Sequence, residues 1–595
     1  MSILVGEVIA IHGIKITLEV FEDSNKETLF YDGRKYKGIS IKEYIKVKRG
    51  FRDIVCVVEG EHLDEFRYVG EHEKKYYIRK VELRPIGYFD KGFFYEGVKY
   101  LPLIKDQAYL LEEDKISDIY GEENHGDFVI GKLLKEELPM SLPWKKVFNT
   151  HIGIFGNTGS GKSNTLTKLY TTLFEQKIQQ INGKSQFIII DFNGEYTTNQ
   201  LVSEDFKCVY KLNTRNEEDK FPLSSTEFWD TETLSILFQA TQNTQKPFIN
   251  RIITGRERYA DYPDSFLNYI KKTYELIFTS ALPKPDSLDL IREITELMGL
   301  NKLLDVLKRI SWNSKNNCFY GNFPGGIGYR YFNSEGDSYN VVLAILVNNI
   351  VLPRMDAFEE FKVRSNIQLI RDLIYGYVQY EFIQPLLKRI ESSLNGLRKV
   401  IDIAETQFVE KPVTIISLRK CKQDIKKVLP LLIAKHYYHP HKDKVANPPD
   451  STVHLIIDEA HNILSQQSSR ESESWKDYRL EMFEEIIKEG RKFGMFLTLS
   501  SQRPADISPT IVSQIHNFFI HRLVNDRDLF LIDNTISTLD NMSRSMIPNL
   551  SRGCCIVTGT SFNLPMLLQV DLLERSKQPD SEDVDLEKIW QIAER

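Results

Sequence analysis

A glycine-rich run of eight residues carries the clearest chemical signal in this chain. The sequence reads GNTGSGKS at positions 156–163, which matches the pattern G-x-x-x-x-G-K-S. In this pattern the glycines let backbone N–H groups turn inward around phosphates, Lys162 reaches the β- and γ-phosphates, and Ser163 binds Mg²⁺. An apolar strand pattern precedes the run and a helical pattern follows it, as such a loop requires. We therefore predict ATP and Mg²⁺ as cofactors, with the nucleotide bound by Gly156, Asn157, Thr158, Gly159, Ser160, Gly161, Lys162, Ser163 and Asn164.

A second candidate site follows the apolar run HLII, which ends in Asp458 and Glu459. A buried strand that ends in two carboxylates is typical of a Walker B element. Asp458 would hold the Mg²⁺ through water, and Glu459 would orient and polarise the attacking water. The alternative is a buried strand that merely ends in surface carboxylates. Asp458 lies 458−162=296 residues after Lys162, and a helical insertion between the two motifs would account for this separation.

Three further stretches contain candidate residues around a nucleotide. Arg491, in EGRKFG, is a candidate arginine finger for an adjacent subunit, although a solvated arginine at a helix end remains an alternative. Gln502 ends the strand pattern MFLTLSS and is a candidate γ-phosphate sensor, or else a turn cap. Asp191 and Glu195, in DFNGEY, follow a strand and could reach the metal shell or a neighbouring subunit, or could simply be satisfied within their loop.

These motifs need an α/β scaffold, and the pattern of elements predicts one. Closely spaced strand patterns rich in Val, Ile and Tyr favour a small N-terminal β-barrel. The alternation of strand and helix then predicts a P-loop core that a mostly helical segment interrupts, whose many aromatic side chains we expect to pack in a core. The expected boundaries are 1–115 for the barrel, 116–150 for a linker, 151–229 and 411–570 for the two parts of the core, 230–410 for the insertion, and 571–595 for a tail.

Bulk composition narrows the class of protein. The 595 residues include 42% hydrophobic and 27% charged side chains, which is typical of folded globular domains, and the net charge is −6. This charge argues against a broad basic surface, but it allows a few cations to gather at a pore. The sequence shows neither a secretory leader nor an apolar run long enough to span a bilayer. The six scattered cysteines fit a reducing compartment, so we expect a cytoplasmic protein without a membrane partner.

The order and wording of these blocks resemble the HerA family, within the HerA/FtsK group of ring translocases. The resemblance covers most of the chain and rests on the barrel, HIGIFGNTGSGKSN, DFNGEY, HLIIDEAHN, EGRKFGMFLTLSSQRP, and RLVNDRDL followed by IPNLSRGCCIVTG. It implies a RecA-like core, a homohexamer with ATP between subunits, and double-stranded DNA moved through a central pore. It also implies a partner nuclease, or an NADase-like effector in anti-phage defence, docked on the barrel. Family members often carry an arginine where this chain has Thr150.

Two functions therefore stand side by side. The first is a hexameric, helicase-type DNA translocase in which Lys162, Glu459, Arg491 and Gln502 are catalytic and Ser163 and Asp458 hold the metal. The second is an ATP-controlled ring scaffold that assembles and activates a partner effector without processive DNA pumping. A soluble ATPase that couples transport across a membrane is a third reading, which the lack of a membrane segment disfavours.

Overall fold

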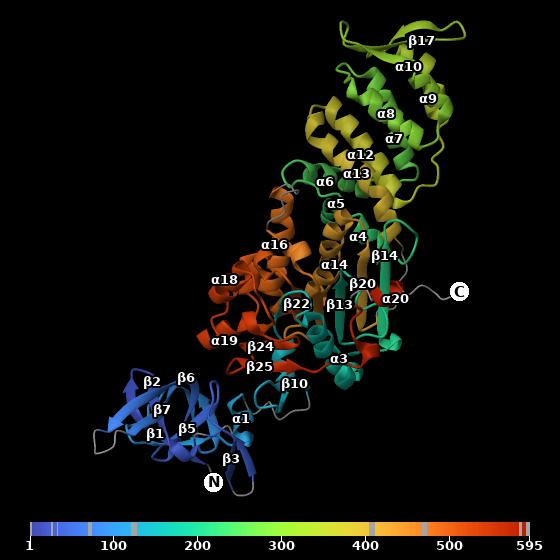
Figure 1. Cartoon of the computed structure of the whole chain (residues 1–595). Helices are drawn as coiled ribbons and strands as arrows, with labels where there is room; N and C mark the ends of the chain where they lie inside the picture. Colours follow the sequence, from blue (N-terminus) through green and yellow to red (C-terminus); the bar gives the residue numbers. More distant parts are fainter. Residues whose placement is uncertain are drawn as a thin grey trace. The chain divides into compact units, whose positions relative to one another are not determined.

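The computed structural model describes residues 3–24, 26, 28–31, 34–68, 74–120, 128–403, 411–466, 473–581 and 586–590. The chain divides into two compact units (Figure 1). The first comprises Met1–Ile178, Gln200–Val202 and Phe496–Arg595, and the second comprises Gln179–Asn199 and Ser203–Met495. The expected end of the helical insertion at 410 and the last residues of the tail lie outside the described residues.

A closed antiparallel barrel forms the N-terminal part of the first unit. Its strands pair in the order β2-β1-β9-β5-β6-β7, and β2 also pairs with β7, so the sheet closes on itself, while β8 extends it. Alternate residues of the strands point inward, which buries a core of Val, Ile and Leu side chains. The predicted barrel is confirmed, with strands β1 Leu4–His12, β2 Lys15–Val20, β5 Tyr44–Arg49, β6 Arg52–Tyr68, β7 Lys74–Asp90, β8 Phe93–Glu96 and β9 Gln107–Leu110, and a separate hairpin of β3 Thr28–Tyr31 and β4 Arg34–Lys37.

Seven further strands of the first unit pair in the order β11-β10-β25-β24-β23-β12-β22. The strand β12 is parallel to both β22 and β23, so the carboxyl ends of these three strands lie at one edge. The strand bounds are β10 Val129–Leu133, β11 Pro139–Ser141, β12 Ile152–Phe155, β22 Met495–Ser501, β23 Asn517–Ile520, β24 Cys554–Gly559 and β25 Met566–Val570. The helices are α1 Glu113–Ile119, α2 Trp144–Phe148, α3 Lys162–Ile181, α17 Pro509–Ser513, α18 Asp526–Thr535, α19 Asn541–Met546 and α20 Leu586–Trp590.

The segment 116–150, expected as a linker, differs from that expectation over its second half. Its strand β10 pairs with β25 near the end of the chain, with Gly131 opposite Val570. Its strand β11 pairs with β10, and α2 follows directly. The two prolines of this segment lie where elements begin. Pro139 is the first residue of β11, and Pro143 immediately precedes α2.

The second unit contains a parallel sheet with strand order β21-β13-β20-β14. Its strands are β13 Ser185–Asp191, β14 Lys207–Asn213, β20 Val413–Lys420 and β21 Thr452–Ile457. The strands β13 and β21 are buried along most of their length, which explains their continuous apolar runs. The helices that follow β20 and β21 are α14 Gln423–Lys444, α15 His461–Leu464 and α16 Glu473–Glu489, after which a 3₁₀ turn covers Gly490–Phe493.

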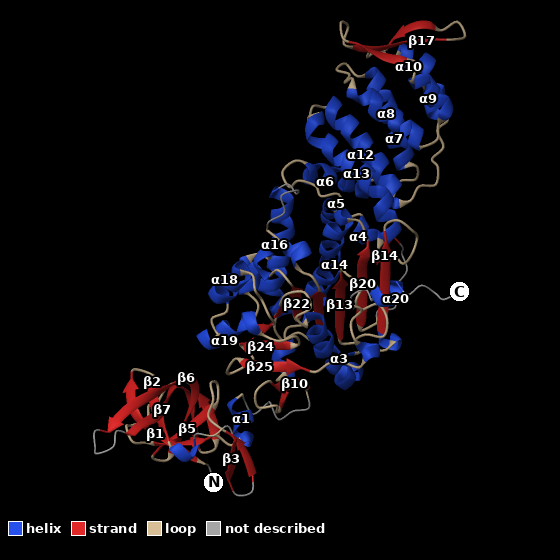
Figure 2. Cartoon of the chain, in the orientation of Figure 1, coloured by secondary structure: helices blue, strands red, loops and turns tan. Residues whose placement is uncertain are grey.

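A helical insertion occupies the chain between β14 and β20. Figure 2 shows its helices grouped together, with a small antiparallel sheet around β17. Aromatic side chains pack in its interior, with ring centroids 4.9 Å apart for Phe228 and Phe358. Its elements are β15 Phe221–Leu223, α4 Ser225–Phe228, α5 Thr231–Leu237, α6 Gln245–Arg258, α7 Ser265–Thr279, α8 Asp286–Leu297, α9 Asn301–Leu307, β16 Ile310–Asn313, β17 Cys318–Phe323, β18 Gly328–Tyr331, α10 Asp337–Val342, α11 Ala344–Asn348, α12 Ala357–Ile374, α13 Tyr380–Val400 and β19 Ile401–Ile403.

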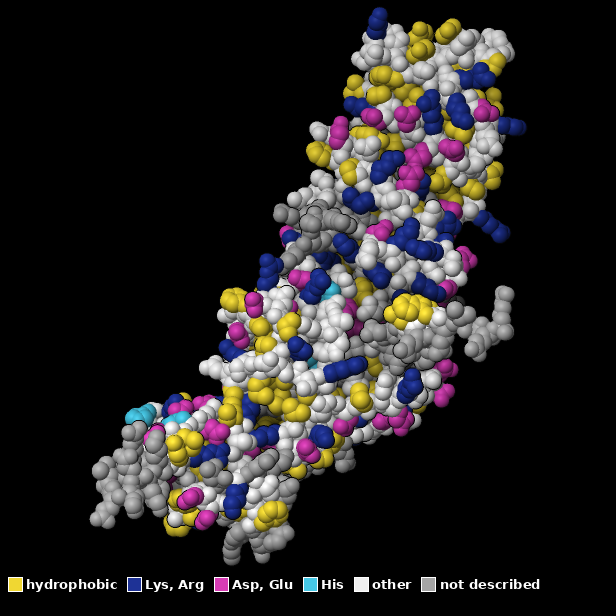
Figure 3. Space-filling model, viewed as in Figure 1, with side chains coloured by type: hydrophobic (Ala, Val, Ile, Leu, Met, Phe, Trp, Pro, Cys, Tyr) yellow, Lys and Arg dark blue, Asp and Glu magenta, His cyan; other side chains and the backbone are white. Residues whose placement is uncertain are grey.

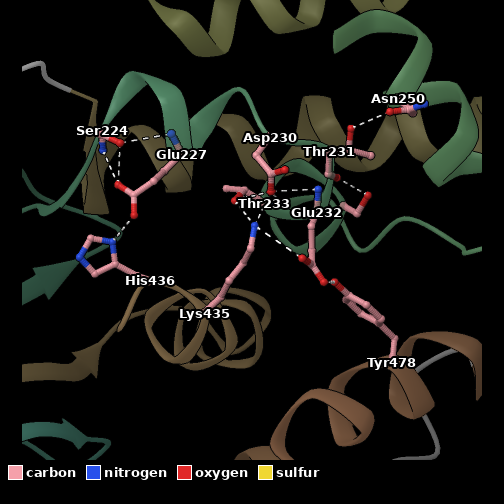
Figure 4. Close-up of polar contacts among 11 residues, drawn as sticks. Ser224, Glu227, Asp230, Thr231, Glu232, Thr233, Asn250, Lys435, His436 and Tyr478 are labelled. Carbon is pink, nitrogen blue, oxygen red and sulfur yellow. Dashed lines mark hydrogen bonds and ion pairs between the residues drawn. The ribbon is translucent and has the colours of Figure 1, made fainter. Parts of the chain in front are cut away.

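A polar network attaches the beginning of this insertion to the long helix α14 (Figure 4). The His436 ring lies 2.7 Å from the Glu227 carboxylate, and Glu227 also accepts hydrogen bonds from Ser224 as part of a capping box. Lys435 donates to Asp230 and lies 3.8 Å from the Glu232 carboxylate. These charge-assisted contacts fix the first turns of the insertion on the sheet that carries the Asp458 motif.

Within the described residues, every helix is too short or too polar to cross a membrane. The predicted fold class is confirmed: the chain is an α/β protein whose P-loop core carries a helical insertion and follows an N-terminal β-barrel.

Candidate ATPase site

The glycine-rich loop leaves the buried strand β12 and leads straight into α3. Gly159 has a φ of 74° and Gly161 a φ of 112°, conformations that glycine adopts readily and other residues do not. Lys162, the first residue of α3, is only 6% exposed, and its Nζ donates to the Asn157 carbonyl oxygen at 3.4 Å. The loop is therefore already turned around its lysine, as a phosphate-binding loop requires.

Parallel strands bring Gln502 to this loop. Because β12 and β22 are parallel neighbours, the loop after β12 and the residue after β22 emerge at the same edge. The Thr158 hydroxyl donates a hydrogen bond to the Gln502 side-chain oxygen, across 344 residues of sequence. The backbone N–H of Gly156 also donates to the Ser501 carbonyl oxygen at 3.3 Å. Gln502 thus lies against the phosphate loop, which is where a γ-phosphate sensor would be placed.

A buried histidine that the sequence did not suggest packs against the phosphate loop. His521 follows β23, the other parallel neighbour of β12. Its backbone N–H donates a hydrogen bond to the Phe155 carbonyl oxygen at 2.7 Å. A Cβ at Gly156 would lie 2.5 Å from the Cβ of His521, so only glycine fits at that point. Burial and the nearby charge of Lys162 lower the pKa of His521 to about 3. The imidazole is therefore neutral at physiological pH and adds no charge beneath the loop.

The two predicted Walker B carboxylates belong to the second unit. Asp458 follows β21, is 2% exposed, and accepts a hydrogen bond from the Tyr196 hydroxyl at 3.2 Å. Glu459 has a φ of 50°, a left-handed conformation that costs a non-glycine residue free energy. Its carboxylate lies 3.3 Å from the His461 ring. A strained glutamate directly after a buried aspartate is the kind of local conformation that concentrates at functional sites.

The DFNGEY stretch ends the neighbouring strand β13 and meets the same sheet edge. The Asp191 carboxylate accepts backbone hydrogen bonds from Asn193, Gly194 and Tyr196 at 2.7–3.2 Å. Burial and the charge of Asp458 raise the pKa of Asp191 to about 6, although backbone hydrogen bonds from Glu195, Tyr196 and Gly194 oppose this shift. Two carboxylates that repel each other in a buried position favour a bound cation, so the local electrostatics fit a metal beside Asp458.

Arg491 lies on the 3₁₀ turn that follows α16, and its side chain is exposed. The turn ends at Gly494, whose φ of 73° reverses the chain into β22. A Cβ at Gly494 would come within 2.8 Å of the Ser451 carbonyl oxygen, so the end of this turn is fixed against the segment before β21. The predicted position of Arg491 on a helix end before a strand therefore matches the structure.

Three comparisons with known proteins bear on these motifs. The family model described as "Helicase HerA, central domain" matches residues 128–317. A protein of Methanocaldococcus jannaschii described as "Probable DNA double-strand break repair helicase HerA" is 24% identical over 556 residues, which cover 90% of this chain and 91% of the relative. The "DNA double-strand break repair helicase HerA" of Sulfurisphaera tokodaii is 22% identical over 481 residues, which cover 80% of this chain and 74% of the relative.

The chain is therefore similar to HerA helicases over most of its length, and residues 128–317 match the central domain of that family. It is accordingly a P-loop ATPase of the helicase type. Among solved structures, VirB4 of Thermoanaerobacter pseudethanolicus aligns with a TM-score of 0.41 and 12% identity, covering 76% of this chain and 98% of that chain. The plasmid coupling protein TrwB in complex with ADP and Mg²⁺ aligns with a TM-score of 0.40 and 10% identity, covering 78% of this chain and 93% of that chain.

The donor atoms of two predicted site residues suit Mg²⁺. The Ser163 hydroxyl, in the first turn of α3, and the buried Asp458 carboxylate are hard oxygen ligands of the type that Mg²⁺ prefers together with phosphate oxygens. The metal would supply charge neutralisation at the β- and γ-phosphates. Among the described residues, the structure contains no group of three or more His, Cys, Asp or Glu side chains that could hold a metal ion.

Thr150, at the position where the resemblance to the HerA family suggests an arginine, is buried. Its hydroxyl donates to the Val147 carbonyl oxygen at 2.8 Å and accepts from the Asn517 side chain at 2.6 Å. Both hydrogen bonds hold the start of β12 to its neighbours. Thr150 therefore has a structural role here and contributes no positive charge to a nucleotide.

Proposed function

We propose that the chain forms a homohexameric ring that hydrolyses ATP to move along double-stranded DNA. The observation that carries the proposal is the turned loop around buried Lys162, together with the buried Asp458 and strained Glu459. Similarity to known helicases supports the motor class, because two of the relatives are named as double-strand break repair helicases. The nucleotide would contact the loop residues from Gly156 to Asn164.

Each residue of the site has a distinct part in this proposal. Lys162 binds the β- and γ-phosphates, and Ser163 and Asp458 hold the Mg²⁺. Glu459 accepts a hydrogen bond from the attacking water and orients it toward the γ-phosphate. Gln502 reports the presence of the γ-phosphate to the loop through its hydrogen bond with Thr158.

The ring is proposed because hydrolysis would use a second cation besides Lys162 at the transferring phosphoryl group. Transition-state charge on the transferring phosphoryl group is commonly stabilised by an arginine, which can be worth about 10³–10⁵ in rate. Arg491 is exposed on its turn and lies at the surface of the subunit. We assign it to the nucleotide of the adjacent subunit, so that hydrolysis changes the contact between neighbours.

The barrel is proposed to dock a partner nuclease or an NADase-like effector. Large apolar side chains are exposed on the barrel, among them Phe51 at 105% and Leu63 at 62%. Such side chains are candidates for contact with a partner. The identity of the partner would decide whether the protein acts in repair or in antiviral defence in the cytoplasm.

The competing function, an ATP-controlled scaffold, makes a different prediction about Glu459. In a scaffold, the partner activity survives Glu459→Gln, because ATP binding alone assembles the ring. In a motor, the partner activity is lost together with hydrolysis. The helicase names of the relatives support the motor, which is therefore the function proposed here.

The decisive experiment measures ATP hydrolysis by the purified protein with and without linear double-stranded DNA, across a series of salt concentrations. A motor that grips the phosphate backbone should be stimulated by DNA, and the stimulation should fall as salt rises. Lys162→Ala serves as the control that reports contaminating ATPases. Turnover that ignores DNA at every salt concentration would refute the DNA motor.

A further inference from the structure

A cavity of about 230 Å³ lies within the helical insertion, far along the chain from either half of the ATPase site. It is formed by the end of α6 and the loop after it, the start of α7, and the last turns of α12. Its lining combines tyrosine rings with arginine side chains: Ile252, Gly255, Arg256, Tyr259, Ser265, Phe266, Tyr269, Arg364, Gln368, Arg371, Asp372, Tyr375 and Tyr377.

The tyrosines at the rim of this cavity are not core residues. The sequence predicted that the aromatic side chains of the insertion pack in its interior, and many do, but Tyr259, Tyr375 and Tyr377 are 52%, 53% and 71% exposed. The rings of Tyr375 and Tyr377 lie 5.9 Å apart. On the face shown in Figure 3, hydrophobic side chains and Lys or Arg side chains are interspersed over the insertion. The exposed rings therefore offer flat apolar surfaces to a ligand.

Most charges around the cavity are already paired. Arg364 donates to Glu360 at 2.7 Å, and Arg256 lies 3.4 Å from the same carboxylate. Asp372 accepts hydrogen bonds from Arg251 at 2.7 and 3.0 Å. These pairs leave the negative charges of the cavity compensated.

Arg371 differs from the other arginines of the cavity. Among the residues that the structure describes, no carboxylate lies within ion-pair distance of it. Its guanidinium instead lies 5.0 Å from the ring centroid of Tyr269 and 5.8 Å from that of Tyr375. Tyr269 is held in turn by a 2.8 Å hydrogen bond from its hydroxyl to Gln368. The Arg371 guanidinium thus lines the cavity next to two aromatic rings, where it can pair with an anionic ligand.

We propose that this cavity binds one nucleotide unit, with its base against the exposed tyrosine rings and its phosphate on Arg371. Single-stranded nucleic acids are bound elsewhere by the same combination, because bases stack on aromatic rings and guanidinium groups pair with phosphates. The volume is below the roughly 300–1,000 Å³ of pockets for drug-sized ligands, which suits a single nucleotide and excludes a duplex. The unit would come from a single strand of DNA or from a free mononucleotide.

The other ligand classes fit less well. An aromatic cage for a cation would be opposed by three arginines in the lining. An acidic peptide could pair with Arg371, but its carboxylates would leave the flat tyrosine faces without a partner. The combination of ring faces and one uncompensated cation matches a planar anion.

This inference does not rest on the proposed motor function, because a nucleotide pocket in the insertion requires neither a ring nor ATP hydrolysis. The test uses the full chain carrying Lys162→Ala without added ATP, so that the phosphate loop contributes little nucleotide binding. The probe is fluorescein-labelled oligothymidylate, and its affinity is measured by anisotropy over a salt series. The variants are Tyr377→Ala and Arg371→Gln.

Matched controls come from the same insertion. Tyr329, on β18, is 69% exposed and does not line the cavity, so Tyr329→Ala controls for loss of an exposed tyrosine. Arg354, an exposed arginine before α12, controls for loss of positive charge as Arg354→Gln. Unchanged thermal unfolding of all four variants checks that each one folds.

The expected result is that Tyr377→Ala weakens oligothymidylate binding about 5- to 100-fold, the range measured for loss of one stacked base. Arg371→Gln should weaken binding and lower the slope of log affinity against log salt by about 0.7, as expected for one lost phosphate contact on a single strand. The two control variants should bind like the parent. Equal affinity in all variants would overturn the proposal.

A second readout locates the ligand. An oligonucleotide that carries 4-thiothymidine should cross-link under ultraviolet light to the peptide containing Tyr375 and Tyr377, and unlabelled dTMP should reduce the cross-link if free nucleotides enter the same cavity. Competition by dTMP as effective as that by the oligonucleotide identifies the free nucleotide as the source, whereas weak competition identifies the strand. Cross-links confined to other peptides, or displacement by poly-glutamate at matched charge, would refute the nucleotide pocket. DNA-stimulated ATPase activity without this cross-link would support the motor and refute the pocket. The cross-link without DNA-stimulated ATPase activity would support the pocket and refute the motor.

Discussion

Replacing Gly161 by alanine should weaken ATP binding at least about 100-fold, whereas replacing Gly159 by alanine should weaken it only about tenfold. Both glycines belong to the same loop and both have positive φ values, 112° and 74°. They differ in their surroundings. A Cβ at Gly161 would lie 2.9 Å from the Cα and 3.0 Å from the nitrogen of Gly553, while a Cβ at Gly159 would meet no atom within 4 Å. The pair therefore separates backbone strain from steric overlap.

The magnitudes follow from these distances. An alanine in a left-handed conformation costs about 1–2 kcal/mol, which for Gly159→Ala reduces affinity by roughly tenfold. At Gly161 the new Cβ must reach a normal contact of about 3.5–4.0 Å, so the loop must move by about 0.5–1 Å. Such a shift would break the 2.8 Å hydrogen bond from the Gly553 N–H to the Ser160 carbonyl oxygen and misplace the amides that face the phosphates. Misplacement by about 1 Å can cost 10²-fold, in addition to the strain.

The assay is titration of each variant with a fluorescent ATP analogue in the presence of Mg²⁺, with thermal unfolding as the check on folding. Gly159→Ala should bind within about tenfold of the parent, and Gly161→Ala should bind at least about 100-fold more weakly. If Gly161→Ala bound as tightly as Gly159→Ala, the close approach to Gly553 would have no functional consequence, and the reasoning from the loop geometry would be wrong.

Three further predictions concern other parts of the molecule. Tyr196→Phe removes the hydrogen bond to the Walker B aspartate and should lower kcat about tenfold with little change in KM, because a hydrogen bond to a charged group is worth about 1.5–3 kcal/mol; an unchanged kcat contradicts this role. Arg491→Ala and Lys162→Ala should each be inactive alone, and a mixture of the two should recover part of the activity if the arginine acts across a subunit interface; no recovery in mixed rings would count against that assignment. Burial alone would raise the pKa of Glu227, but His436 and Ser224 hold it at about 2, so its stabilising effect is present above pH 4.5 and is lost as the pH falls toward 2. Glu227→Gln should therefore lower the free energy of unfolding by about 1–2 kcal/mol at neutral pH, a value discounted for partial exposure, and the difference measured by thermal unfolding should shrink below pH 4.5; a difference that does not depend on pH would exclude this carboxylate as its cause.

The amino-acid sequence by itself determined the chemistry that depends on neighbours along the chain. The spacing of Gly156, Gly161 and Lys162 is a local requirement of a phosphate loop, and the structure places these residues as the pattern predicts. An apolar run followed by Asp458 and Glu459 is equally local. Closely spaced short strand patterns rich in Val, Ile and Tyr also indicated a barrel at the N-terminus, because each of these patterns is local.

The tertiary structure alone decided which distant residues meet. Thr158 meets Gln502 because β12 pairs with β22, and Tyr196 reaches Asp458 across 262 residues because β13 pairs with β21. The sequence did not indicate that His521 contacts the phosphate loop, because a histidine after a short apolar run can take many positions in a fold. Residues 116–150 resembled a linker because β10 and β11 are short, and their strand character depends on pairing with β25, which comes more than 400 residues later. Hydrogen bonds between strands satisfy backbone groups that no local pattern can assign, so strand order and register follow from packing of the whole chain.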